Sequence, residues 1–515
     1  MGSGQKFNQK NKNMKKFILS ILTVAVALPA LAGGLMTNTN QSASFLRSIA
    51  RGTSLDPDAV YHNPAGLVFL ENGWYLGLSD QMAYQTRSTE STFAPFAMNA
   101  ATPGQMTKEF KGDVFSPLVP SIHLAWKKNR WALMFGIGVN GGGGTIEYDK
   151  GLASFERQFA VLPAGISQLG SAYGLSASQY SMDMYLKGSS MTIALNLGVA
   201  FRITDWLSAS ALLRISGSSN SYKGHMKNIS VNPTAVDPNM GLNGQMMSAS
   251  AFFGVAGQML QGQYQKMVEA GKGDTPDAQK LLAAIQAAGT NAVLTADHIL
   301  DVKQTGYSVS PVLALAFHHG PWDASVKYEF KMATELEIES AAVSANDPVI
   351  NAIFPNGAKI KAETPALLAV AASRHCGPVK VTLEWHHFFD KDADNSFTQA
   401  GAVLGNTNEY LAGAEWAINK RWMVSLGAQR TQLNLDESKY SDLGFSISST
   451  SVGLGLKFNI TDAIALNAGF MKTFYDKDIT NTYVDATNPA LNYKDIYNRT
   501  SISWGLGLDF KFGKK

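Results

Sequence analysis

The sequence predicts an all-β protein, a transmembrane antiparallel β-barrel of about fourteen strands with helical extracellular loops. Three observations carry this prediction: long stretches alternate between apolar and small or polar residues, the connections between them alternate between short and long, and glycine is abundant. The chain has 515 residues, of which 47 are glycine and 45% are hydrophobic, and its mean hydropathy is −0.06. This composition is typical of an all-β protein rather than of a helical membrane protein.

The alternation is clearest in two segments. In MTIALNLGVAF, residues 191–201, the odd positions are apolar, and in SISWGLGLDFKF, residues 501–512, the even positions are apolar. A period of two gives a strand one apolar face. The opposite face carries Gly, Ser, Thr, Ala and scattered charges of both signs, which suits the inside of a barrel whose apolar face contacts lipid.

The strands are expected near residues 73–88, 118–127, 130–140, 187–203, 206–222, 303–318, 321–338, 358–374, 378–389, 407–418, 421–435, 446–459, 463–475 and 499–512. Short connections such as KKNR, ITDW and INKR alternate with long ones at 89–117, 141–186, 223–302, 339–357, 390–406, 436–445 and 476–498. Short periplasmic turns, long extracellular loops and two periplasmic termini are expected of a bacterial outer-membrane barrel. We therefore expect residues 73–515 to form a barrel in the outer membrane.

An export signal precedes the barrel. The apolar run FILSILTVAVALPALA, residues 17–32, follows Lys15 and Lys16 and ends in Ala-Leu-Ala, so residues 1–32 are interpreted as a signal peptide. Met14 is a candidate natural start, which would make residues 1–13 an extension. The leader holds five lysines and no acidic residue, so the remaining chain is slightly acidic and no nucleic-acid partner is expected. The single Cys376 excludes an intramolecular disulfide framework.

Two of the long loops, 141–186 and 223–302, have a helical pattern. Residues 153–175 and 248–300 are rich in Ala, Gln, Leu and Met, with apolar residues three to four positions apart. Such helices can simply pack on each other as a cap on the barrel. Alternatively, they form a hydrophobic groove, because Met and aromatic side chains adapt to varied apolar ligands. The candidate groove residues are Phe155, Phe159, Leu162, Phe252, Phe253, Met259 and Leu260.

Charged residues alternate onto the inner face of the predicted barrel. They are Arg214, Lys327, Glu329, Lys331, Lys361, Glu363, Lys380, Glu384, His386, Glu409, Glu415 and Lys457. An ion-pair network that fills the lumen accounts for most of them. Arg214 and Lys327 are the candidates for holding an anionic head group of a ligand.

No catalytic or metal site is expected. Adjacent strand residues point to opposite faces, so His386 and His387 cannot chelate one metal ion together. A serine paired with His386, as in an outer-membrane lipase, has no support because no G-x-S-x-G motif is evident. We therefore expect no enzymatic activity, no metal and no cofactor.

The segment GVNGGGG, residues 138–144, ends the third predicted strand. It lacks the G-K-[ST] ending of a phosphate-binding loop. Consecutive glycines weaken a strand and permit a bend. In a barrel wall, Gly141, Gly142, Gly143 and Gly144 are therefore candidates for a bend that opens a gap between strands.

The segment LDPDAVYHNPAGLVFLENGWYLGLSDQMAY, residues 55–84, resembles the N-terminal region of the FadL-like long-chain fatty acid and hydrocarbon transporters of the outer membrane. The resemblance implies a hatch at residues 33–72, folded inside the barrel, with Asn63, Pro64, Ala65 and Gly66 carrying its motif. It also implies that substrates enter through a groove in the outer loops and leave sideways beside a bent third strand. Locally, Asn63 can cap a turn and Pro64 suits the first position of a helix.

This chain departs from the family pattern at three places. His62 stands where an aromatic residue is usual, three residues follow the last aromatic Phe512, and the loop 223–302 is long for the family.

The resulting functional hypothesis is passive transport of hydrophobic molecules, with long-chain fatty acids as the leading candidates, across the outer membrane by a monomer in contact with outer-membrane lipid. The expected ligand is a fatty acid or hydrocarbon. Two alternatives from other classes stay open: a surface barrel whose long loops bind a host or cell-surface partner, and a lipid-cleaving enzyme that depends on His386.

Overall fold

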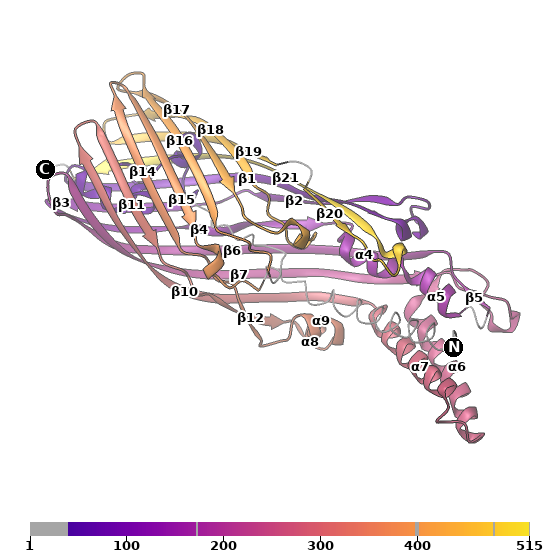
Figure 1. Cartoon of the computed structure of the whole chain (residues 1–515). Coiled ribbons are helices and arrows are strands. Elements are labelled where there is room, and N and C mark those ends of the chain that lie inside the picture. The colour runs from indigo at the N-terminus through magenta and orange to yellow at the C-terminus, as the bar shows by residue number, and fades with distance from the viewer. Residues whose placement is uncertain (1–39, 171–173, 397–400, 477–478, 514–515) are drawn as a thin grey trace.

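The computed structural model describes residues 40–170, 174–396, 401–476 and 479–513. The predicted signal peptide and residues 33–39 of the predicted hatch lie outside the described residues. Within these ranges, fourteen strands form a closed antiparallel barrel, in which each strand pairs with the next and the last pairs with the first (Figure 1). In order, the ring consists of β1 (Gly73–Phe93), β3 (Ser121–Lys128), β4 (Trp131–Tyr148), β6 (Tyr180–Arg202), β7 (Leu207–Val231), β10 (His298–His319), β11 (Trp322–Glu329), β14 (Leu367–Cys376), β15 (Val379–Phe388), β16 (Thr407–Ala417), β17 (Trp422–Gln432), β18 (Ser449–Asn459), β19 (Ile464–Tyr475) and β21 (Tyr493–Phe512).

Shorter strands extend the barrel wall on the extracellular side. They are β2 (Thr107–Ser116), β9 (Met247–Ser248), β12 (Glu335–Ser340), β13 (Lys359–Lys361) and β20 (Ile479–Tyr483), while β5 (Leu175–Ser176) and β8 (Thr234–Ala235) form a separate pair. The predicted fourteen-stranded barrel is confirmed.

Several strand ends differ from the sequence-based prediction. The predicted strand 321–338 is divided into β11 and β12, and the predicted strand 358–374 is divided into β13 and β14. Strands β11 and β14 belong to the ring, whereas β12 and β13 pair with each other on its extracellular side. Alternation of period two is the same in both places, so it could not separate them. In addition, β4, β6, β7 and β10 continue beyond the expected ends, so parts of the predicted loops 141–186 and 223–302 are strand.

The outer face of the barrel is apolar. On β10, Leu313 and Leu315 are about half exposed, at 48% and 50%, and the neighbouring strands carry similar residues. Trp131, Trp206 and Trp322 lie at the ends of strands near the short turns. A band of exposed aliphatic residues bordered by aromatic residues is stable only against lipid, so this is a transmembrane barrel of the outer-membrane type.

Six helices of the described residues lie within three of the long connections between strands. They are α4 (Ala153–Ala160), α5 (Leu162–Gly170), α6 (Ala249–Glu269), α7 (Pro276–Leu294), α8 (Ala342–Ala345) and α9 (Pro348–Ile353). The side chains of Ser248 and Thr275 cap α6 and α7 by accepting from Ala251 N and Ala278 N. These two helices project away from the barrel at the end opposite the C-terminus (Figure 1). Within the described residues, no helix is both long enough and apolar enough to span a membrane.

The N-terminal segment lies inside the barrel. It contains α2 (Ala43–Ser48), α3 (Ala59–His62) and the 3₁₀ helix η2 (Pro64–Phe69), and α2 packs against β16, β17, β18, β19 and β21. Glycines on the inner face make room for it: a Cβ on Gly413 or Gly427 would lie 2.4 or 2.2 Å from the carbonyl oxygen of Ser48. Part of the high glycine content therefore serves the close approach of this segment to the wall.

Candidate functional site

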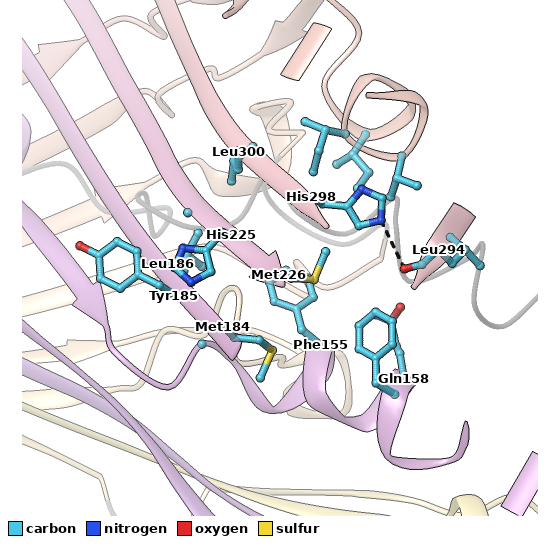
Figure 2. A pocket seen from close by; sticks show the side chains of 16 residues that line it. Phe155, Gln158, Met184, Tyr185, Leu186, His225, Met226, Leu294, His298 and Leu300 are labelled. Carbon is cyan, nitrogen blue, oxygen red and sulfur yellow. Dashed lines mark hydrogen bonds between the residues drawn. The ribbon is translucent and has the colours of Figure 1, made fainter. Parts of the chain in front are cut away.

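An apolar pocket lies at the extracellular end of the barrel, between α4, α9 and the upper ends of β6, β7 and β10 (Figure 2). The space within it, open solvent at its mouth included, is about 810 Å³. Its lining residues are Gly151, Phe155, Gln158, Phe159, Met184, Tyr185, Leu186, Gly224, His225, Met226, Leu294, His298, Leu300, Val349, Ile350 and Ile353. Most of these side chains are aliphatic, aromatic or thioether groups, so the pocket suits an apolar ligand.

Buried charges hold α4 against the barrel. Glu156 accepts a hydrogen bond from the Tyr180 hydroxyl at 2.7 Å, and the Arg157 guanidinium binds Asp495 at 2.8 Å. Burial alone would lower the pKa of Arg157, but Asp495, together with Asp442 and the nearby tyrosines, outweighs burial and raises this pKa. The polar side of α4 is therefore fixed, and Phe155 is held at the pocket.

Two histidines are among the polar residues of the pocket, together with Gln158 and Tyr185. His298 Nδ1 lies 2.7 Å from Asp347 Oδ2, and His298 Nε2 lies 3.3 Å from the Leu294 carbonyl oxygen (Figure 2). His225 Nε2 lies 3.2 Å from Asp183 Oδ2. No lysine or arginine is among the described residues that line this pocket.

The structure separates the predicted groove residues into three groups. Phe155 and Phe159 line the pocket. Leu162, Phe252 and Phe253 lie behind it, in a buried apolar cluster that also contains Phe159. The last two, Met259 and Leu260, lie further along α6, where Met259 is 46% exposed.

Most of the pocket wall lies outside the groove predicted from the sequence. It is formed by strand ends and a short helix within the predicted loops, with the residues Met184, Leu186, Met226, Leu300 and Ile350. The alternation of apolar and polar residues continues past the membrane-spanning part of β6, and it could have indicated the pocket residues that lie on strands.

Arg214 and Lys327 lie far from the pocket lining, at the hatch. Lys327 Nζ donates to the Tyr61 carbonyl oxygen at 2.9 Å, and both cations lie over the Tyr61 ring, 5.0 Å and 4.8 Å from its centre. Glu329 binds both of them. In this structure the two cations hold the hatch against β7 and β11.

The motif Asn63–Gly66 forms a compact turn. Asn63 makes no side-chain cap; its Nδ2 instead donates to the Ser54 carbonyl oxygen at 3.1 Å. The 3₁₀ helix begins at Pro64, and Gly66 N donates to the Asn63 carbonyl oxygen at 2.9 Å. A Cβ on Gly66 would lie 2.1 Å from Asn63 Nδ2, so this turn needs a glycine there.

A network of buried ion pairs fixes the rest of the hatch. Arg51 binds Asp58 at 2.8 Å and Glu415 of β16 at 3.1 Å, and Arg47 binds the same Glu415 at 2.7 Å. Burial raises the pKa of Asp58, but Arg51 outweighs burial and holds this pKa well below its usual range. The lower lumen is therefore filled by charged groups that have partners.

The barrel wall is interrupted beside the glycine run. β4 does not end there but continues to Tyr148, with irregular register between Val139 and Gly141 and between Gly142 and Gly144. On its other side, β4 pairs with β3 only up to Gly138 and with β2 only from Thr145. The chain between β2 and β3 is Pro-Leu-Val-Pro, residues 117–120, whose two prolines cannot donate backbone hydrogen bonds. Between the described strands, residues 139–144 thus have no ladder partner on this side.

The hatch touches this interruption directly. Gln41 Nε2 donates to the Val139 carbonyl oxygen at 2.7 Å, and the Tyr61 hydroxyl donates to Asn140 Oδ1 at 3.3 Å. The bulged part of β4 thus pairs with β6 on one edge and contacts the hatch, rather than a strand, on the other.

Comparison with known proteins agrees with this geometry. Neither a family model nor a curated protein matches the sequence. Among solved structures, a FadL homologue of Pseudomonas aeruginosa matches with a TM-score of 0.57 and 12% identity, covering 94% of this chain and 100% of that one. A toluene transporter of Pseudomonas putida, TodX, matches with a TM-score of 0.50 and 11% identity, covering 95% and 100%. The chain has the FadL-like fold.

In this FadL-like barrel, His386 is a structural group. Its Nε2 lies 2.7 Å from Glu384 Oε1 and its Nδ1 lies 2.9 Å from Glu409 Oε2. Glu384 in turn accepts from the hatch backbone at Gly52 N, at 2.7 Å. Across the described ranges, no cluster of three or more His, Cys, Asp or Glu side chains has a geometry that could hold a metal ion.

Proposed function

We propose that this protein transports hydrophobic molecules passively across the outer membrane, with residues 33–72 acting as the hatch. The ligand enters the apolar pocket at the outer end and leaves sideways through the interrupted wall at β4. The observation that carries the proposal is the position of the interruption in the barrel wall. Toward the pocket at the extracellular end the lumen is apolar, and toward the opposite, lower end the N-terminal segment occupies the lumen.

The pocket is continuous with apolar side chains that approach the gap. Leu186, Leu300 and Ile350 line the pocket and also belong to a buried cluster that contains Ile146 of β4. Ile146 is two residues from Gly144, at the edge of the bulge. In the proposed route, an apolar molecule passes along this cluster to the gap, and its packed side chains move aside as the molecule passes.

A straight path through the barrel is unfavourable for such a molecule. Below the gap, the lumen holds the hatch and its ion pairs, and moving each CH₂ group out of apolar surroundings costs about 0.8 kcal/mol. A lateral exit into the bilayer avoids this cost. The proposal covers both ligand classes that the resemblance implies, fatty acids and neutral hydrocarbons, because either presents an apolar body to the pocket.

The proposal is tested by closing the gap reversibly. A Cβ on Gly143 would lie 3.9 Å from Val119 Cγ2, so Val119→Cys combined with Gly143→Cys brings two thiols within reach of a disulfide across the interruption. The exposed Cys376 is replaced by Ser in all variants. Uptake of a labelled long-chain fatty acid and a labelled hydrocarbon is then measured in cells with the protein, without it, and with the oxidised or reduced double variant.

We expect uptake to depend on the protein, to fall on oxidation and to recover on reduction. The reduced double variant is the control, because it contains the same substitutions at Gly143, where φ is 103°. Equal uptake with and without the protein would overturn transport. Unchanged uptake in the oxidised variant would overturn the lateral exit.

A further inference from the structure

The connection between β17 and β18 folds into the barrel. Its residues 437–439 are exposed, but residues 440–447 turn inward, and we call this segment the inner loop. Its large side chains and its one carboxylate are all buried, with at most 8% of their surface exposed: Tyr440, Asp442, Leu443, Phe445 and Ile447. Connections normally run over the surface of a protein, because buried backbone groups need hydrogen-bond partners. A buried connection in the lumen is therefore a feature to explain.

The tip of the inner loop reaches a distant part of the barrel wall. Around the ring, β19, β21, β1 and β3 lie between β18 and β4. Nevertheless, the Asp442 carboxylate accepts a hydrogen bond from Ser154 N in the first turn of α4, at 2.7 Å. Beside it, Leu443 is buried in the apolar cluster that contains Ile146 of β4 and Leu186 of the pocket wall. The inner loop thus crosses the upper lumen and ends between the pocket and the gap.

The ends of the inner loop are fixed to the nearer wall. The Tyr440 carbonyl oxygen accepts from the hydroxyl of Tyr497 on β21 at 3.1 Å. The Phe445 carbonyl oxygen accepts from Arg87 on β1 at 2.7 Å, and the Arg87 guanidinium lies 4.6 Å from the centre of the Phe445 ring. These contacts leave the tip as the part that can move while both ends stay in place.

The tip is a tight turn, in which Gly444 N donates to the Ser441 carbonyl oxygen at 3.0 Å. This hydrogen bond lies within the loop and does not depend on the far wall. The far wall contributes the hydrogen bond from Ser154 and the packing of Leu443. The tip can therefore swing away as a unit when these contacts are released.

The contact of Asp442 with the far wall is a costly one. Burial raises the pKa of Asp442 and the nearby Asp495 raises it further, while Arg157 and the hydrogen bond from Ser154 only partly offset them. A raised pKa means that the ionised carboxylate is less stable in this position than in water. At neutral pH, the inward position of the tip therefore carries a cost that the outward position avoids.

We propose that the inner loop is a gate on the ligand route, and that Leu443 is the side chain that a ligand displaces between the pocket and the gap beside β4. The inference rests on the proposed function and adds to it a closure on the extracellular side, separate from the hatch. Because one apolar cluster joins the pocket wall to the edge of the gap, a side chain inserted into it from another part of the ring obstructs the route. The gate is closed in this structure.

The test measures how accessible position 443 is. Leu443→Cys is made in a Cys376→Ser background, because Cys376 is exposed. Modification by a membrane-impermeant maleimide is followed in lipid nanodiscs, with and without hexadecane. The matched control is Ile338→Cys, because Ile338 is a buried residue of the same cluster but belongs to β12 in the wall. A third variant adds Asp442→Asn to Leu443→Cys, which keeps an oxygen for Ser154 N and removes the buried charge.

We expect hexadecane to speed the modification of Leu443→Cys severalfold and to leave Ile338→Cys unchanged. Adding Asp442→Asn should slow the modification by about 10-fold, the equivalent of one pKa unit of relief. Equal rates for the two single-cysteine variants, or no response of Leu443→Cys to hexadecane, would overturn the gate. Faster modification in the presence of Asp442→Asn would overturn the part assigned to Asp442.

Uptake separates the gate from transport itself. Leu443→Ala removes the side chain from the route, so we expect cells to take up labelled hexadecane faster, whereas Ile338→Ala should leave the rate unchanged. Electrophoretic mobility without heating shows that each barrel is folded. Uptake that depends on the protein but is the same or slower in folded Leu443→Ala would overturn the gate and leave the proposed function standing. Equal uptake with and without the protein would overturn the proposed function.

Discussion

The lower half of the lumen and the upper part of the β1–β21 pair both contain inward-facing arginines, but only those of the lower half have carboxylate partners among the described residues. Arg47 and Arg51 of the hatch share Glu415, and Arg214 binds Glu329. Arg87 and Arg499 of the upper half have no such partner among the described residues. The same residue type is thus held by carboxylates in the lower half, whereas in the upper part of the β1–β21 pair it contacts the rings of Phe445 and Tyr475.

Removing a compensated cation should have the largest effect. Arg51→Leu leaves Asp58 and Glu415 buried with fewer partners, and we expect it to destabilise the seated hatch by about 3–5 kcal/mol. Hydrogen exchange of residues 43–62 measures this, because opening of the hatch exposes these amides while the barrel stays intact. The control is Arg430→Leu, which breaks the exposed pair with Asp476 and should cost about 1 kcal/mol or less. Similar effects of the two substitutions would contradict the structural role of the hatch network.

The hatch should also loosen in acid because of His62. His62 is buried, and burial lowers its pKa to about 3, so the seated hatch keeps the imidazole neutral. When the hatch is exposed, the His62 imidazole has its ordinary pKa of about 6.5 and takes up a proton as the pH falls below that value. The stability of the seated hatch is therefore lost as the pH falls, by about 2 kcal/mol between pH 7 and pH 5.

His62→Phe isolates this contribution. Phe45 stacks on the His62 ring at 5.7 Å, so an aromatic replacement keeps the packing and removes the titration. Asp56 and Asp58 take up protons only below about pH 4, outside this window. We expect hydrogen exchange of the hatch to change less with pH in the variant than in wild-type protein. Parallel profiles for the two proteins would show that His62 does not titrate on opening.

The sequence predicted the barrel better than it predicted the site, for a physical reason. Alternation is a local property of each strand, so the fourteen strands, the helical loops and the N-terminal motif were found without knowing which strands are neighbours. The pocket and the arginine pair depend on register. Arg87 and Arg499 lie at opposite ends of the sequence, and only closure of the ring makes them neighbours. Arg214 and Lys327 were ligand-binding candidates because they face inward. Arg87 and Arg499 face inward as well, so this property does not distinguish cations with carboxylate partners from cations without them among the described residues.

The apolar wall of the pocket should contribute a moderate share of ligand affinity. Phe155→Ala removes an aromatic surface from the pocket lining, and we expect ligand affinity to fall about 10-fold, for the fatty acid and its methyl ester alike. The affinity for each ligand is measured with the protein in lipid nanodiscs, and binding to empty nanodiscs is subtracted. Met259→Ala is the control, because Met259 is exposed on α6 outside the pocket lining. A loss restricted to the acid would place the carboxylate, rather than the tail, against α4.

The smallest effect should also have the opposite sign. Arg87→Met, measured without ligand, removes one of two facing cations that have no counter-ion within the described ranges, so we expect the barrel to become more stable by about 1 kcal/mol. Arg47→Met in the hatch provides the contrast, because it leaves Glu415 buried with one cation fewer and should destabilise. Urea unfolding in lipid vesicles measures both. If Arg87→Met instead destabilises the protein without ligand, the hydrogen bond from Arg87 to Phe445 outweighs the repulsion, and Arg87 is a structural residue like Arg47.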